Sequence, residues 1–143
     1  VYTLAEEGSK PRVVNVHRGF VNDVEFLPDN SGFLSVGIDR SVRLTNPSNG
    51  KSSLITTLPV ALKSIAVHPV TQAVIGVAST GQIFEIDIAA KSYSLLRDEA
   101  PNRILSVAFH PTRPEIAYGM ELLNEKGLPQ RGMVKLVDTQ KKT

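Results

Sequence analysis

The sequence predicts an all-β chain built from repeated four-stranded units. Three alternating apolar and polar segments end in proline, at Pro28, Pro69 and Pro111, which lie 41 and 42 residues apart. Nowhere does the chain sustain the 3.6-residue apolar period of an amphipathic helix. A four-stranded sheet of this length leaves both of its faces open, and stacking such sheets around an axis buries them. The fold class that follows is a β-propeller in which each unit is one blade.

The first unit carries the clearest strand pattern. Val24 and Phe26 alternate with Asp23 and Glu25, which is the period of a strand with one buried face, and we expect the apolar pair to be buried. Turn formers at 28–32 end this strand, and further strands are predicted at 33–38 and 42–44. Ahead of the unit, we expect the end of a strand at 1–4, a turn at 5–10 and a short strand at 12–16.

The later units follow the same plan with one departure. Strands are predicted at 53–58, 62–67, 73–78, 82–88 and 93–96, and then at 104–109, 115–120 and 133–137. The spacing from Asn46 to Asp87 is 41 residues, but from Asp87 to Asp138 it is 51. We therefore expect an inserted loop of about ten residues at 121–132. The predicted division is 1–16 as the end of one blade, 17–58 and 59–98 as blades, and 99–143 as a blade without its outer strand.

Composition narrows the function classes. The 143 residues are 41% hydrophobic and 21% charged, as is usual for a globular domain. There is no cysteine, which excludes disulfides and thiolate metal sites and favours a cytoplasmic or nuclear location. A net charge of +2 and the absence of tryptophan do not favour nucleic acid, and no apolar run is long enough to span a membrane.

The first unit resembles a known family, the WD-repeat β-propellers. The residues that carry the resemblance are His17, the strand ending in Pro28, Ser35, Asp39, and an apolar strand 42–44 followed by Thr45 and Asn46. Thr45 stands where the family has Trp. The other units keep only the terminal Asp, at Asp87 and Asp138, and lack the loop His. The resemblance covers nearly the whole chain.

The resemblance implies a structural role for three of these residues. In the family, a His, a Ser or Thr, an Asp and a Trp form a hydrogen-bonded set, so His17, Ser35 and Asp39 would form that set without its Trp. Propellers close with four to eight blades, and this family mostly with seven. The chain supplies about three, so the rest of a propeller or further copies of the chain would be needed to close a ring.

Several other residues resemble metal-binding or catalytic groups, but structural roles explain them better. His68 and His110 recur before Pro, yet they lie 42 residues apart on neighbouring units, where a shared position at a strand end explains them. Metal-binding histidine spacings and phosphate-binding glycine loops are absent. The run 32–37 around Ser35 is one residue too long for a nucleophile elbow, and no helix follows it. We therefore expect no catalytic residue, no metal and no cofactor.

With no catalytic or metal site predicted, the loops at the surface are the candidate functional region. The resemblance implies that one face of these loops binds partner proteins. An apolar side chain among basic ones is the composition of an interaction hot spot. The candidate partner-binding residues are Arg18, Phe20, Asn22, Arg40, Lys63, Arg103, Leu122, Leu123, Leu128 and Arg131. For any one of them alone, a solvated loop residue is the simpler interpretation. An inserted loop is the stronger signal, because ordering extra residues costs entropy unless something uses them.

The function that the sequence predicts is a non-catalytic scaffold for protein–protein interaction within a multi-subunit complex. Two alternatives remain open. One is an enzyme propeller with a cofactor or metal in its central channel, and the other is a propeller fragment that assembles with copies of itself.

Overall fold

The computed structural model describes residues 10–141, and over these residues the chain forms eleven β-strands and no helix. Within that range, no helix is long and apolar enough to cross a membrane. The predicted strand end at 1–4 lies outside the described residues. In chain order the strands are β1 (Val21–Phe26), β2 (Phe33–Gly37), β3 (Ser41–Thr45), β4 (Ser52–Thr57), β5 (Leu62–Val67), β6 (Val74–Ala78), β7 (Gln82–Asp87), β8 (Ser92–Asp98), β9 (Arg103–Phe109), β10 (Glu115–Leu123) and β11 (Pro129–Asp138).

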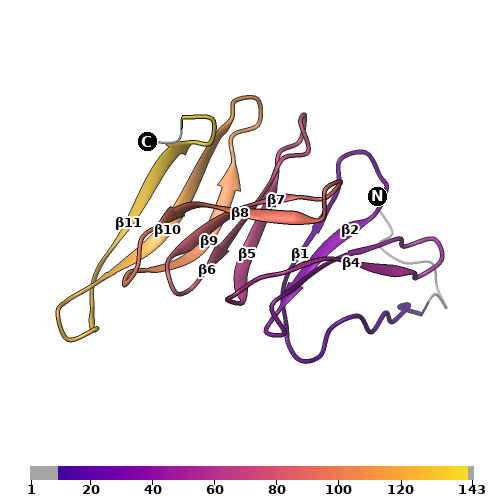
Figure 1. Cartoon of the computed structure of the whole chain (residues 1–143), viewed down its shortest axis with the longest axis horizontal. Helices are drawn as coiled ribbons and strands as arrows, with labels where there is room; N and C mark the ends of the chain where they lie inside the picture. Colours follow the sequence, from indigo (N-terminus) through magenta and orange to yellow (C-terminus); the bar gives the residue numbers. More distant parts are fainter. Residues whose placement is uncertain (1–9, 142–143) are drawn as a thin grey trace, which may run out of the picture.

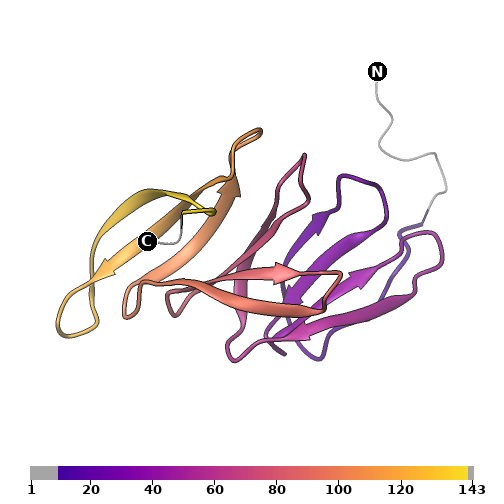
Figure 2. The ribbon, with the colours of Figure 1, turned by 45° about the horizontal axis from the view of Figure 1, so that its top comes forward.

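The strands form three antiparallel sheets in which neighbours in sequence are neighbours in space. Sheet 1 has the order β1-β2-β3-β4, sheet 2 has β5-β6-β7-β8, and sheet 3 has β9-β10-β11. The three sheets stand face to face in a row, each twisted (Figures 1 and 2). The first strands of the sheets, β1, β5 and β9, are in contact with one another in that order. This is the arrangement of propeller blades, so the predicted fold class is confirmed.

Two apolar layers hold the sheets together. Leu34, Val36 and Val42 of sheet 1 pack with Leu62 and Phe84 of sheet 2. The second layer joins the opposite face of sheet 2 to sheet 3, through Ile75, Val77, Ile83, Ile104, Ile116 and Tyr118. Sheet 2 is therefore covered on both faces, and every residue of β6 is buried. Each fully buried Leu or Ile stabilises the stack by roughly 1.5–3 kcal/mol.

The burial predicted for β1 is reversed. The strand alternates as expected, but Phe26 is 70% exposed and Val24 is also exposed, while Asp23 and Glu25 are partly buried. Asp23 faces sheet 2, where its Oδ2 accepts hydrogen bonds from the Ile65 N–H (2.9 Å) and the Ser64 hydroxyl (3.2 Å). The reason is that a blade has two faces to cover, and within the described residues only one side of sheet 1 has a neighbouring sheet.

The strand predicted at 12–16 is not formed. These residues have no ladder partner, and most of their side chains, including Val13, are exposed. Strand propensity alone does not make a strand, because the backbone groups need a neighbouring edge to pair with. All four positions of sheet 1 are already filled by β1 to β4.

The loop predicted at 121–132 is instead part of a long hairpin. Glu121 pairs with Gly132 and Leu122 with Arg131, so the extra residues lengthen β10 and β11 and leave only a short turn between them. Asn124 closes that turn, because its Oδ1 accepts hydrogen bonds from the N–H groups of Lys126 and Leu128. Gly127 in the turn has a φ of +74°, which a glycine adopts without strain.

Candidate functional site

The side chains of His17, Ser35 and Asp39 lie together at the start of sheet 1. His17 Nδ1 donates to the Asp39 carboxylate at 3.0 and 3.1 Å, and His17 Nε2 lies 2.7 Å from the Ser35 hydroxyl, which donates to it. Asp39 also accepts hydrogen bonds from the Arg18 N–H (2.9 Å) and from the hydroxyl of Ser41 (2.8 Å). The set therefore ties the loop before β1 to the turn between β2 and β3.

The protonation of Asp39 follows from these contacts. Burial alone would raise the pKa of Asp39, but hydrogen bonds from the Arg18 backbone, the His17 ring and Ser41 outweigh burial and hold the pKa far below its usual range. Asp39 is therefore charged at neutral pH, and its hydrogen bonds are of the stronger, charge-assisted kind.

The same three residues have the connectivity of a Ser–His–Asp triad. The exposed fraction of Ser35 is only 1%, and the His17 side chain is equally buried. A nucleophile must reach a substrate atom, and the Ser35 hydroxyl is enclosed by its own sheet. No group of three or more His, Cys, Asp or Glu side chains that could hold a metal ion occurs among residues 10–141. This geometry suits a framework.

The framework presents three of the candidate residues to solvent. Arg18, Phe20 and Arg40 are all exposed, and Phe20 has 78% of its surface accessible. The loop before β1 and the turn between β2 and β3 carry them, and both are fixed by backbone hydrogen bonds, from Ile38 N–H to Phe20 O (2.9 Å) and from Leu58 N–H to Arg40 O (2.9 Å). These side chains therefore project from an ordered backbone.

Most of the candidates share one edge of the stack, which we call the entry edge. It is formed by residues 17–20, 38–40, 58–61, 79–81, 99–102 and 124–128, where β1, β5 and β9 begin, and it runs along the lower side of Figure 1. Lys63 and Arg103 stand exposed at the starts of β5 and β9, and Arg131 near the start of β11. Arg103 Nη1 lies 3.6 Å from Glu121 Oε2.

Three candidate residues are in less accessible places. The Asn22 side chain donates to Leu62 O at 2.8 Å, so it bridges sheets 1 and 2. Leu122 is partly buried against the apolar layer between sheets 2 and 3. Leu123 is partly buried, and its N–H donates to Asn102 Oδ1 at 3.0 Å. Of the three predicted leucines only Leu128, 57% exposed in the hairpin turn, offers a large apolar contact.

His68 and His110 each accept hydrogen bonds from the backbone of the turn that follows them. His68 Nδ1 accepts hydrogen bonds from the N–H groups of Val70 (3.1 Å) and Thr71 (3.2 Å), so the ring proton is on Nε2, which donates to Arg113 O (3.1 Å). His110 Nδ1 likewise accepts from the backbone of the turn that follows it. His68 also meets Phe109 edge to face, with ring centroids 5.2 Å apart. These contacts are structural.

A partly buried charge cluster between sheets 2 and 3 was not predicted from the sequence. The Glu99 carboxylate accepts hydrogen bonds from Tyr118 Oη (2.5 Å), Arg97 Nε (2.7 Å) and Lys135 Nζ (2.9 Å). Burial would raise the pKa of Glu99, but these donors lower it to about 2. Burial, with Glu99 beside it, raises the pKa of Tyr118. Arg97 and Glu99 are two residues apart, but Tyr118 and Lys135 are 19 and 36 residues from Glu99 and complete no known motif, so no sequence signal points to the cluster.

Comparison with known proteins identifies the class of fold. The structure is similar to the solved structures titled "Structure of U3-55K" and "Crystal structure of RRP9 WD40 repeats", each with a TM-score of 0.66 and 13% sequence identity. In both cases 85% of this chain is covered, and it matches 41% of the other chain. No family model matches the sequence, and no curated protein matches it either. The chain therefore has the fold of part of a WD-repeat propeller, spanning about two fifths of the length of those structures.

Proposed function

We propose that this chain is a non-catalytic scaffold segment that binds a partner protein at its entry edge, within a multi-subunit complex. The observation that supports it is the exposed Phe20 beside the exposed Arg18 in the loop before β1, which the charged Asp39 ties by hydrogen bonds to the turn that carries Arg40. A rigid aromatic anchor beside arginines is the composition of an interface hot spot, and little ordering entropy is lost when such a loop binds. We place this scaffold inside the cell, in the cytoplasm or nucleus.

Replacing the exposed residues without disturbing the framework tests this proposal. The variant F20A/R40E/L128S changes three entry-edge positions and leaves both strands of the long hairpin in place. A matched control, V70S/R113E, changes exposed residues at the opposite ends of the strands. We expect affinity-purified partners to fall at least tenfold with the first variant and to be unchanged with the second, at equal melting temperatures. Full retention of partners by the first variant would contradict the site.

A second candidate function has its own observation. Val134 is 72% exposed and Leu136 is 68% exposed on the outer face of sheet 3, and Phe26 lies on the outer face of sheet 1. Apolar sheet faces of this kind need cover, either from the rest of a propeller or from further copies of the chain. The solution mass of the chain separates these cases, because self-assembly gives a discrete oligomer. Metal analysis and an absorption spectrum test the enzyme alternative in the same sample.

A further inference from the structure

Two tight turns at the entry edge have the same backbone hydrogen bonds but carry different residues at one position. In the turn between β2 and β3, the Arg40 N–H donates to Gly37 O (3.1 Å), and Arg40 O accepts from the Leu58 N–H (2.9 Å). In the turn between β6 and β7, the Gly81 N–H likewise donates to the carbonyl three residues earlier (3.0 Å), and Gly81 O accepts from the Glu99 N–H (2.8 Å). Arg40 and Gly81 therefore hold equivalent places in sheets 1 and 2.

The backbone at this position favours glycine. The φ angle is +65° at Arg40 and +105° at Gly81, in the left-handed region that costs free energy for a residue with a long side chain. Among residues 10–141, the exposed Arg40 guanidinium forms no hydrogen bond and no ion pair, so contacts within the described chain do not explain an arginine here. Lys91, in the turn between β7 and β8, also has a positive φ (+52°), so strain by itself does not mark a site.

The surroundings of Arg40 distinguish it from other strained positions. The Ile38 N–H donates to Phe20 O (2.9 Å), and the side chains of both residues are exposed. The Arg18 N–H donates to Asp39 Oδ2 (2.9 Å), which holds Arg18 beside the same turn. These bonds place two exposed apolar side chains and two exposed arginines on one short stretch of the entry edge. Apolar area ringed by charged groups is the usual anatomy of a protein interface.

The unpaired charges on this stretch are positive. Lys63 is exposed near the start of β5, and the hydrogen bond from the Asn22 side chain to Leu62 O (2.8 Å) places β5 beside β1 at this point. Neither Lys63 nor the two arginines forms an ion pair among residues 10–141. The carboxylate of Asp39 is instead occupied by hydrogen bonds from His17 and from backbone N–H groups.

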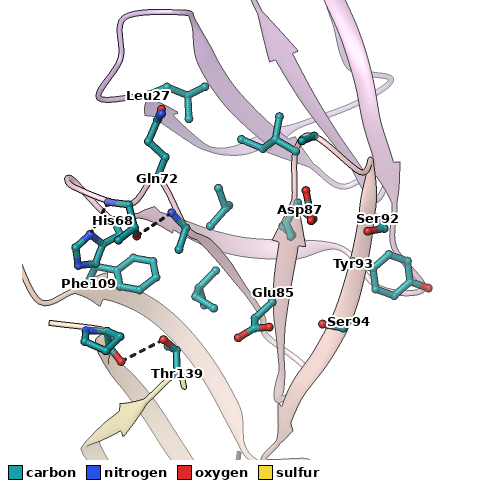
Figure 3. Close-up of a pocket in the computed structure, with 18 of the residues that line it drawn as sticks. Leu27, His68, Gln72, Glu85, Asp87, Ser92, Tyr93, Ser94, Phe109 and Thr139 are labelled. Atoms are coloured by element: carbon teal, nitrogen blue, oxygen red, sulfur yellow. Dashed lines mark hydrogen bonds between the residues drawn. The ribbon is translucent and has the colours of Figure 1, made fainter. Parts of the chain in front are cut away.

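The groove at the opposite edge of the stack has the opposite charge. Its lining includes Asp29, Glu85 and Asp87, and no Lys or Arg is among the described residues that line it; Figure 3 shows Glu85 and Asp87 on one wall. Complementary charge attracts a partner, and like charge disfavours it. An acidic partner is therefore directed to the entry edge.

We propose that this stretch of the entry edge binds an acidic segment of the partner protein, which places an apolar side chain against Phe20 and Ile38. Its Asp or Glu carboxylates bind the surrounding cations, Arg18, Arg40 and Lys63. This inference rests on the proposed function and adds the chemistry of its partner. A guanidinium donates two parallel hydrogen bonds to one carboxylate, which makes the contact directional as well as charged. Nucleic acid fits less well, because its repeating phosphates require a longer basic surface.

Substitutions at Arg40 and Lys91 separate the side chain from the turn. R40G and K91G each relieve a positive φ, so neither should lower the melting temperature. The probe for fluorescence anisotropy with the whole chain is a labelled pool of peptides with Leu, Ile or Phe at the centre and Asp or Glu at every other position. We expect R40G and R40Q to weaken binding of this pool about fivefold, and K91G, at the opposite edge, to leave it within about twofold. Unchanged affinity in R40G and R40Q overturns the proposal.

Control ligands test the two parts of the chemistry. A pool with Lys or Arg in place of Asp or Glu should not bind, and an acidic pool with Ser at the centre should bind more weakly than the apolar one. Equal binding of the acidic and basic pools overturns the proposal. Tighter binding of a single-stranded oligouridylate than of the acidic pool overturns the assignment to a protein segment and identifies nucleic acid as the occupant.

Affinity purification distinguishes failure of this inference from failure of the proposed function. Partners that are kept by R40G and R40Q but lost by F20A/R40E/L128S would leave the entry edge as an interface and overturn its acidic partner. Partners lost by R40G and R40Q but kept by K91G support the acidic segment. Partners kept by all four variants would overturn both.

Discussion

Removing the Asp39 carboxylate should destabilise sheet 1 by breaking its hydrogen bonds with His17 and Ser41. In D39A the buried His17 Nδ1–H loses its acceptor, and an unsatisfied buried donor costs about 1–3 kcal/mol. The hydrogen bonds from Ser41 to Asp39 are lost as well, at about 1 kcal/mol each. Ser41 Oγ lies 3.0 Å from His17 Nδ1 and compensates in part. We therefore expect a loss of about 3 kcal/mol in the free energy of unfolding.

Urea denaturation followed by far-ultraviolet circular dichroism measures this loss, because the chain has no tryptophan for fluorescence. With a slope of about 2 kcal/mol per molar urea, the midpoint should fall by about 1.5 M in D39A and by about half of that in D39N, which keeps an uncharged acceptor. D29A is the matched control, since Asp29 is an exposed carboxylate in a turn of the same sheet. If the urea midpoint of D39A equals that of D29A, the hydrogen-bonded set of His17, Ser35 and Asp39 does not stabilise sheet 1.

Three further predictions test other parts of the fold. Because the folded pKa of Glu99 is lowered to about 2, its contribution to stability is present above the ordinary value of 4.5 and is lost as pH falls toward 2; E99Q should therefore flatten the decline in melting temperature between pH 5 and pH 3. G81A should lower the melting temperature far more than G127A, because a Cβ at Gly81 would lie 2.6 Å from Ala100 N whereas Gly127 has open space around it; equal effects would contradict this packing. F26K should reduce concentration-dependent association seen by light scattering while lowering the melting temperature only slightly, because Phe26 is 70% exposed on the open face of sheet 1 and loses only its edge-to-face contact with Phe33; unchanged association would contradict this.

The sequence predicted the blades because their period and turn residues are local signals. It did not predict which face of β1 is covered. Alternation shows that two faces differ, but in a stack of sheets both faces can be buried. The carboxylate of Asp23 is satisfied on the covered face by the Ile65 N–H and the Ser64 hydroxyl of the next blade. The prediction of a strand at 12–16 was wrong for a related reason. A strand forms only where a neighbouring strand is present to pair with it, and propensity does not show whether one is.

Some parts of the candidate site could likewise be predicted from the sequence, and others could not. The contacts of His17 with Ser35 and Asp39 agree with the family resemblance, since a motif fixes those positions in one blade. The inserted residues were noticed through the repeat length, but length alone does not tell a loop from a longer hairpin. The Glu99 cluster joins residues of different sheets, and only the packing of the sheets brings such residues together.

Polar bridges across the seams between sheets bear on the proposed role of the entry edge. The seam between sheets 1 and 2 has the bonds of Asn22 and Asp23 to β5 beside its apolar layer. The seam between sheets 2 and 3 has Glu99 with Lys135 near the entry edge, and His68 with Arg113 at the opposite edge. Apolar packing alone would allow neighbouring sheets to slide, whereas directional hydrogen bonds at the ends of the strands fix their register. The loops of successive blades are therefore held at set positions, and in the proposed complex side chains from different blades would meet one partner without reordering the backbone.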